Sequence, residues 1–368
     1  MKVVFRADAS LEMGTGHIMR CLTLATALRE RGAECCFVCR EHPGNFIANI
    51  VARGFEVCSL PWEEPIRQTK HAPSFVQPTH VAWLGTDWRT DADLTQTALD
   101  DLVIDWLVVD HYALDVNWER ALRSMCRRIM VIDDLADRPH DCDLLLDQNL
   151  GRNAEDYRDL ISEKSALLIG PLFALLRPEF AAIRNYSLSR RAIPALKHLL
   201  ITLGGVDRDN VTGEILATLM DCSLPSDCKI TVVMGPHAPW LESVRQLADT
   251  LPWRTDVLDN VSDMARLMAD SDLAIGAAGV TAWERCCLCL PSVVIAIAEN
   301  QRSGATALQQ SGAARVIKSR EAIASVLPEL ITHMVDSETV LKMQYACYQT
   351  ADGRGVARVV DELVACNA

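Results

Sequence analysis

The chain has 368 residues, which is too long for one ordinary hydrophobic core, so we expect two domains. Hydrophobic residues make up 49% and charged residues 23%, a balance typical of an α/β protein, and the formal net charge is −13. This acidity, with no dense run of Lys and Arg to offset it, argues against nucleic-acid binding. No apolar run approaches the ~18 residues that a membrane span needs, and Arg6 and Asp8 interrupt any secretory signal. We therefore expect a cytoplasmic protein.

The first predicted strand, residues 2–5, leads into a glycine-containing loop at residues 14–16 and an amphipathic helix from Ile18. A strand, a glycine turn and a helix in this order leave backbone N–H groups where an anion or a sugar can dock. His17 falls at the helix N-terminus, where the dipole disfavours an imidazolium, so the ring should accept a proton near pH 7. We interpret His17 as a candidate base. The alternative is a histidine that caps its helix without any chemistry.

Strand-like and helical runs alternate through the first half, which predicts a parallel sheet with crossover helices. Residues 61–86 interrupt the alternation with prolines and scattered charges, and we interpret them as a surface excursion in which His71 and His80 are ordinary loop histidines. Three later strands end in polar groups, at residues 110–112, 133–134 and 147–149. Such residues point into the crevice where open α/β sheets bind ligands, although Asp110 fits a turn cap equally well. Of Asp133 and Asp134, only one can face a site.

The 14 cysteines lie mostly in apolar runs. Cys36 and Cys39 have a redox or zinc spacing, but no second pair completes a zinc site. We therefore expect the cysteines to serve as small buried hydrophobic residues in a reducing cytosol, and we expect no metal.

A polar, basic stretch at residues 186–196 is the predicted linker, which gives domains at 1–185 and 186–368. Beyond it, a strand ends in Gly204-Gly205, and the following helix offers a second N-terminus for phosphate. A later buried strand opens through Gly279 into a helix that Thr281 is available to cap. Glu284 in the first turn is either a charge stabilised by the helix dipole or a carboxylate that holds a ribose diol.

Residues 6–21 closely resemble the PseG family, the UDP-sugar hydrolases of pseudaminic acid biosynthesis. The resemblance continues in the same order at residues 109–112, 132–138, 140–143, 170–177 and 204–207. The second half also looks like the broader MurG-type glycosyltransferase pattern, at residues 278–284 and in Asn300-Gln301. Several separated motifs in the correct order are more specific than one glycine loop.

The resemblance implies a GT-B architecture, with two Rossmann-like α/β domains facing a cleft and the nucleotide mainly on the C-terminal one. It implies hydrolysis of UDP-2,4-diacetamido-2,4,6-trideoxy-β-L-altropyranose to UDP and the free sugar, with no metal and no cofactor. The family's catalytic histidine falls on His17. The positions implied for substrate binding are Asp8, Gly16, Gly205, Asn210, Gly279, Thr281, Glu284 and Gln301.

The expected partner is therefore a UDP-linked diacetamido sugar, with no nucleic acid and no membrane, and we expect a monomer. Two other functions remain open: a MurG-like glycosyltransferase, and a nucleotide-sugar-binding protein without turnover. Three features depart from the family pattern. Phe173 stands where tyrosine is common, Asp147 opens a triplet expected to read Asn-Gln-Asn, and the 61–86 excursion is longer than in compact members.

Overall fold

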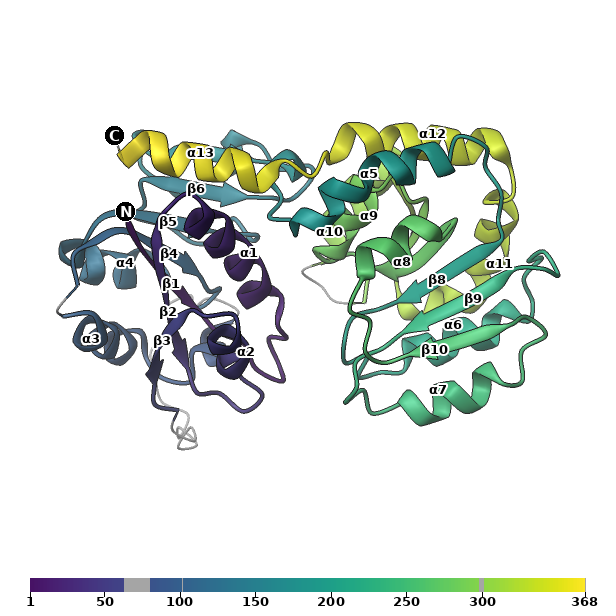
Figure 1. Ribbon diagram of the computed structural model, residues 1–368, viewed down its shortest axis with the longest axis horizontal. Coiled ribbons are helices and arrows are strands. Elements are labelled where there is room, and N and C mark those ends of the chain that lie inside the picture. The colour runs from purple at the N-terminus through teal and green to yellow at the C-terminus, as the bar shows by residue number, and fades with distance from the viewer. Residues whose placement is uncertain (63–79, 101, 298–300, 368) are drawn as a thin grey trace. The chain divides into compact units, whose positions relative to one another are not determined.

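The computed structural model describes residues 1–62, 80–100, 102–297 and 301–367. The chain forms two compact units (Figure 1). Unit 1 consists of Met1–Leu175 and Gly355–Ala368, and unit 2 consists of Leu176–Arg354. Most of the predicted excursion, residues 63–79 with His71, lies outside the described residues, as does Asn300.

Unit 1 is built on a seven-stranded parallel sheet in the order β3-β2-β1-β4-β5-β6-β7. Phe5 in β1, an interior strand, pairs with Phe37 on one side and Val108 on the other. The strands are β1 (Lys2–Ala7), β2 (Glu34–Arg40), β3 (Glu56–Leu60), β4 (Ile104–Asp110), β5 (Cys126–Ile132), β6 (Leu144–Asp147) and β7 (Ala166–Ile169).

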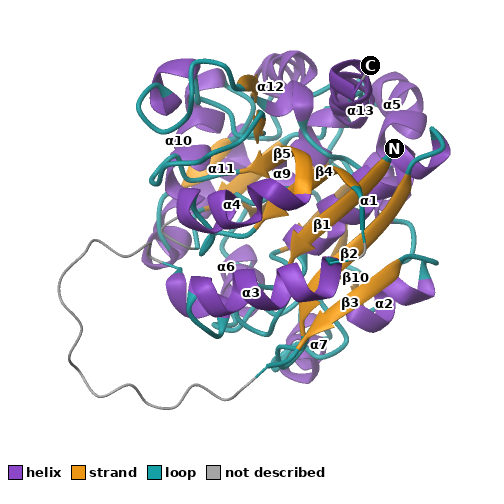
Figure 2. Ribbon diagram, turned by 90° about the vertical axis from the view of Figure 1, so that its left-hand side faces the viewer, coloured by secondary structure: helices purple, strands orange, loops and turns teal. Residues whose placement is uncertain are grey.

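Helices cover both faces of this sheet, which explains why its strands are continuous apolar runs. Successive residues of β1 point to opposite faces: Phe5 joins a core cluster with α1 and α13, and Val4 joins one with α3 and α4 (Figure 2). The helices of unit 1 are α1 (Gly16–Glu30), α2 (Ile47–Ala52), α3 (Trp88–Leu99), α4 (Val116–Leu122) and α13 (Gly355–Asn367), with short 3₁₀ turns η1 (Val81–Leu84), η2 (Arg123–Met125), η3 (Ala154–Tyr157) and η4 (Pro171–Phe173).

Unit 2 has a six-stranded parallel sheet in the order β10-β9-β8-β11-β12-β13. Its strands are β8 (His198–Thr202), β9 (Lys229–Val233), β10 (Thr255–Leu258), β11 (Leu273–Ala277), β12 (Ser292–Ile295) and β13 (Arg315–Ile317). Its helices are α5 (Pro178–Arg190), α6 (Val211–Leu219), α7 (Leu241–Ala248), α8 (Met264–Asp270), α9 (Thr281–Cys287), α10 (Arg302–Ser311), α11 (Ile323–His333) and α12 (Ser337–Thr350), with the 3₁₀ turn η6 (Arg320–Ala322).

The two units differ from the predicted domains at the boundary. Helix α5 runs through the predicted junction at 185/186, so the first part of the predicted linker 186–196 is helical. Within it, the Ser187 hydroxyl donates to the carbonyl of Leu288 (2.6 Å), and the buried Arg191 guanidinium donates to backbone carbonyls at the end of α8. These polar side chains anchor the helix to unit 2.

The second difference is the C-terminal helix α13, which returns to unit 1 instead of completing unit 2. Val359, Val360 and Leu363 lie in the same core cluster as the buried face of α1. The indole N–H of Trp106 in β4 donates to the carbonyl of Leu363 (3.2 Å). Helical periodicity predicts such a helix but does not identify the sheet on which it packs.

The cysteines are free thiols and most are buried, including Cys36 and Cys39 in β2. In the described parts of the chain, no group of three or more His, Cys, Asp or Glu side chains is arranged to hold a metal ion. None of the described helices combines the length and apolar character required to cross a bilayer.

Candidate active site

Each sheet reverses its strand order between two neighbouring strands, and this is where open α/β sheets bind ligands. In unit 1 these strands are β1, which Asp8 follows, and β4, which ends at Asp110. In unit 2 they are β8, followed by Gly204-Gly205, and β11, followed by the loop that contains Gly279. The sequence-predicted residues therefore gather at the ligand-binding edge of each sheet.

Helix α1 places His17 against the end of β4. The Nδ1 atom of His17 lies 2.6 Å from Oδ1 of Asp110, which is fully buried. Burial alone would raise the pKa of Asp110, but the Arg20 guanidinium and His17 hold it well below its usual range. The carboxylate is thus ionised and the shared proton belongs to Nδ1, which leaves Nε2 as the proton acceptor of the ring.

The Nε2 atom of His17 has no hydrogen-bond partner among the described residues, and 10% of the side chain is exposed. An imidazole that a carboxylate orients through one nitrogen, while the other nitrogen is open, is placed to act as a general base. The contact favours the interpretation of Asp110 as a site residue over that of a turn cap.

Sequence reasoning missed Arg20, which fixes this arrangement. Its Nε and Nη2 atoms donate to the two oxygens of Asp110 (2.7 and 2.6 Å), and Nη1 lies 2.7 Å from Oδ2 of Asp134. Asp134 also accepts from the Tyr112 hydroxyl (2.7 Å), whereas Asp133 pairs with another arginine. The available signal was a charged residue three positions after His17 on a helix that is otherwise mostly apolar.

An aromatic cluster of His80, Trp83 and Tyr112 lies beside His17. The Tyr112 ring meets the His17 ring edge-on at 4.6 Å between centroids, and Trp83 does so at 6.5 Å. The centroid of the His80 ring lies 4.4 Å from that of Trp83 and 5.3 Å from that of Tyr112. His80 lies in a turn, as predicted, and its ring also packs in this cluster, whereas Trp83 was missed because no periodicity marks its segment.

Asp8 is buried inside unit 1. Its Oδ1 atom accepts from the backbone N–H of Arg40 (2.6 Å) and pairs with the Arg6 guanidinium (2.8 Å). Nε2 of His111 lies 3.5 Å from the other oxygen, and burial lowers the pKa of His111 to about 3, so that ring is neutral. These contacts give Asp8 a structural role, and its contact with substrate stays a prediction.

Three predicted glycines leave open space beside the backbone. A Cβ atom built on Gly16, Gly205 or Gly279 would meet no other atom within 4 Å. The folded chain alone does not require glycine at these positions, but a ligand that approaches the backbone closely would.

The N-terminus of α6 differs from the prediction of a phosphate site. The carboxylate of Asp207 accepts from the N–H groups of Val211 and Thr212 (both 2.9 Å), and Asn210 accepts from that of Gly213 (3.2 Å). The first N–H groups of the helix are thus already bonded. Asn210 acts as the helix cap, and its contact with nucleotide stays a prediction.

The N-terminus of α9 has no side-chain cap, so the prediction that Thr281 caps it is wrong. The Thr281 hydroxyl instead accepts from Nη1 of Arg285 (3.2 Å), whose Nη2 donates to the carbonyl of Ala277 (2.8 Å). Arg285 is fully buried and fixes the loop between β11 and α9. Sequence reasoning missed this residue as well.

Glu284 faces Arg177, with 3.6 Å between Oε1 and Nη2, and only 12% of its side chain is exposed. Burial raises the pKa of Glu284 to about 7, although Arg177 opposes the shift. Gln301 accepts a hydrogen bond from the backbone N–H of Ile297 (3.3 Å) just before α10. Both interpretations of Glu284 remain open.

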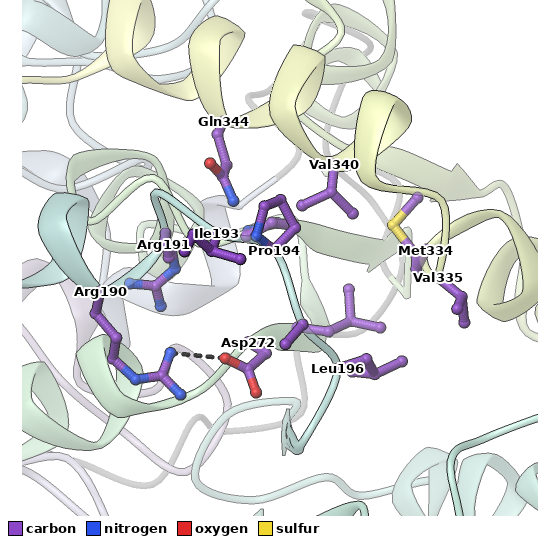
Figure 3. Close-up of a pocket in the computed structure, with 13 residues that line it drawn as sticks. Arg190, Arg191, Ile193, Pro194, Leu196, Asp272, Met334, Val335, Val340 and Gln344 are labelled. Carbon is purple, nitrogen blue, oxygen red and sulfur yellow. Dashed lines mark ion pairs between the residues drawn. The ribbon is translucent and has the colours of Figure 1, made fainter.

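A cavity in unit 2 lies elsewhere (Figure 3). Its lining includes Leu196, Asp272 and Pro291, which precede β8, β11 and β12, and an ion pair joins Arg190 to Asp272 (2.7 Å). The cavity therefore opens at the amino ends of the strands, opposite the edge that carries Gly205 and Gly279.

Part of the chain matches a known protein family, and most of the chain is similar to individual known proteins. Residues 209–359 match the glycosyltransferase family 28 C-terminal domain. The chain is 26% identical over 313 residues to the UDP-2,4-diacetamido-2,4,6-trideoxy-β-L-altropyranose hydrolase of Campylobacter jejuni, covering 85% of this chain and 97% of that protein. It is 25% identical over 306 residues to the uncharacterized protein MJ1062 of Methanocaldococcus jannaschii, covering 82% of this chain but only 57% of that protein.

The crystal structure of Acinetobacter baumannii MurG superposes with a TM-score of 0.70 at 15% identity, over 99% of both chains. Together with the two parallel sheets, this superposition confirms the predicted GT-B fold.

Proposed function

We propose that the protein hydrolyses UDP-2,4-diacetamido-2,4,6-trideoxy-β-L-altropyranose to UDP and the free sugar, a cytoplasmic step of pseudaminic acid biosynthesis. The observation that carries the proposal is the pair of His17 and Asp110, an open imidazole nitrogen oriented by an ionised, buried carboxylate. The similarity to the Campylobacter hydrolase over 85% of the chain supports the choice of substrate.

In the proposed reaction, Nε2 of His17 takes a proton from a water molecule as the water oxygen attacks the anomeric carbon. The bond between that carbon and the phosphate oxygen breaks, and UDP leaves from the opposite face with the electron pair. Asp110 stabilises the imidazolium that forms. Because UDP is already a stable anion, the departing oxygen needs little help from a general acid, and we assign no metal to the step.

Unit 2 is the proposed nucleotide-binding unit, which the match of residues 209–359 to the family 28 domain supports. The open backbone at Gly205 and Gly279 suits close approach of the diphosphate, and N–H groups there would stabilise its growing charge. Glu284 would accept hydrogen bonds from the ribose hydroxyls. Thr281 and Gln301 complete the proposed contacts.

The test is the His17→Asn variant. A positioned base contributes about 10²- to 10⁴-fold, so UDP release should fall by that factor while calorimetry still detects binding of the UDP-sugar. Turnover close to the wild-type rate would reject His17 as the general base and, with it, the proposed mechanism.

The family 28 match and the MurG-like fold favour a second candidate, a glycosyltransferase that passes the same sugar to an acceptor. Incubation with the UDP-sugar alone separates the two. A hydrolase releases UDP and free sugar without an acceptor, whereas a transferase remains inactive until one is added.

A further inference from the structure

The half-buried indole of Trp83 forms one side of the surroundings of His17. Its ring lies 5.7 Å from that of Tyr112 with the planes 21° from parallel, and it meets the His17 ring at 77°. Trp83 comes from η1, the short turn at the end of the 61–86 excursion. The excursion therefore contributes an aromatic surface to the candidate site.

The indole N–H of Trp83 has no hydrogen-bond partner among the described residues. This group is bonded to a carbonyl or carboxylate oxygen in Trp106, Trp118, Trp240 and Trp253, whereas in Trp88 and Trp283 it likewise has no partner among the described residues. Tryptophan combines a large apolar ring with one polar donor and normally uses both when it is covered. A ligand that covers Trp83 would have an apolar face and an acceptor to offer.

The aromatic cluster is also uncharged near neutral pH. Burial lowers the pKa of His80, against the opposite effect of Asp137, and the nearby Arg138 guanidinium lowers it further. A neutral imidazole beside Trp83 does not attract a diphosphate. The cluster therefore offers ring faces and a donor to a ligand but no cationic group to a diphosphate.

We propose that Trp83, with His80 packed against it, is a specificity-determining residue that binds the sugar on which His17 acts. The ring packs on the apolar substituents of the sugar, and the N–H donates to an acetamido carbonyl. This inference rests on the proposed function, because it assigns the sugar half of that substrate. The sugar suits the surface, since acetamido groups at C2 and C4 each bring a methyl group and a carbonyl acceptor, and a methyl group replaces the hydroxymethyl group at C6.

The test measures binding in a His17→Asn background, so that the substrate is not consumed. Trp83→Ala should weaken binding of the UDP-diacetamido sugar by about tenfold and leave the affinity for UDP unchanged. Trp83→Phe should retain most of the sugar affinity because it keeps an aromatic ring. The preference for the diacetamido sugar over UDP-N-acetylglucosamine should also shrink in Trp83→Ala.

Trp88→Ala is the matched control, because this half-buried tryptophan belongs to α3 and its ring contacts the Arg89 guanidinium (4.6 Å) instead of His17. Both affinities should persist in it. Unchanged sugar binding in Trp83→Ala, or an equal loss for UDP and UDP-sugar, would overturn the inference. These binding results do not depend on turnover, so failure of wild-type hydrolysis would reject the proposed function separately.

Discussion

At the scale of single residues, the candidate site depends on one carboxylate with several donors. Asp110 receives hydrogen bonds from Nδ1 of His17 and from two nitrogens of Arg20, and no solvent reaches it. The orientation of the His17 ring is therefore set inside the protein, as expected for a preorganised base.

Asp110→Asn should reduce kcat by about 10²- to 10⁴-fold with little change in KM, because the neutral amide neither fixes the His17 tautomer nor stabilises an imidazolium. UDP release under saturating substrate measures the effect. Asp115→Asn is the control: Asp115 caps α4, and asparagine caps a helix equally well, so this variant should behave like the wild type. A wild-type kcat in Asp110→Asn would contradict the assignment.

Glu284 should make stability depend on pH. Its pKa of about 7 in the folded chain lies above the ordinary value of 4.5, so the native state holds a proton that the unfolded state releases. The free energy of unfolding should therefore fall as pH rises from about 4.5 to 7. Between pH 5 and pH 8, urea denaturation should show a loss that is roughly 1–3 kcal/mol smaller in Glu284→Gln than in the wild type, because Asp147, whose pKa burial also raises to about 7, contributes equally in both proteins. An identical loss in both proteins would exclude Glu284 as the cause.

The sequence predicted the residues whose role follows from local context and missed those whose role depends on distant partners. His17 stands at a helix start, which marks it as a candidate, and Asp110 stands at a strand end, where local context fits a site residue and a turn cap equally well. Arg20 acts through a carboxylate 90 positions away, and Trp83 lies in a segment without periodicity. Asp8 and Asn210 have side chains that suit a ligand and an internal hydrogen bond equally well.

At the scale of elements, the parallel strands were predictable because burial on both faces demands apolar runs with polar ends. The boundary near α5 was not, because the same polar residues occur in linkers and in helices anchored by tertiary hydrogen bonds. The loops after β8 and β11 depend in turn on close packing of neighbouring segments.

Gly235 follows β9 and tests this dependence. A Cβ atom there would collide with the carbonyl oxygen of Gly205, to which the Gly235 N–H donates at 2.9 Å. Gly235→Ala should shift the Gly205 loop, destabilise unit 2 by about 1–3 kcal/mol and weaken UDP binding. Thermal unfolding and calorimetry provide the readouts. In Gly304→Ala the new methyl group meets no atom within 4 Å, so stability should be retained or rise slightly; similar losses in both variants would contradict this account.

At the scale of the whole molecule, unit 2 is continuous in sequence and unit 1 is not. Unit 2 contains its sheet and the residues proposed to hold the nucleotide. In unit 1, the apolar residues of α1 share their core cluster with α13, so residues 1–175 alone lack part of that core.

Residues 176–354 expressed alone should fold cooperatively and bind UDP with nearly the affinity of the full chain. Residues 1–175 alone should be unstable, and joining them to residues 355–368 through a short flexible linker should restore a cooperative transition. Circular dichroism melting and calorimetry measure both outcomes. An unfolded 176–354 fragment, or a stable 1–175 fragment, would contradict the division into units.

The return of α13 to unit 1 also has a consequence for synthesis on the ribosome. After residue 175 has been translated, residues 176–354 must follow before α13 exists, which takes roughly 10–40 s at ordinary elongation rates. During that interval the nascent chain holds a nearly complete seven-stranded sheet. The apolar surface that α1 and the sheet bury against α13 is then exposed. The unit that is translated first is therefore the one that matures last, and chaperones that recognise exposed apolar surface have that interval in which to bind it.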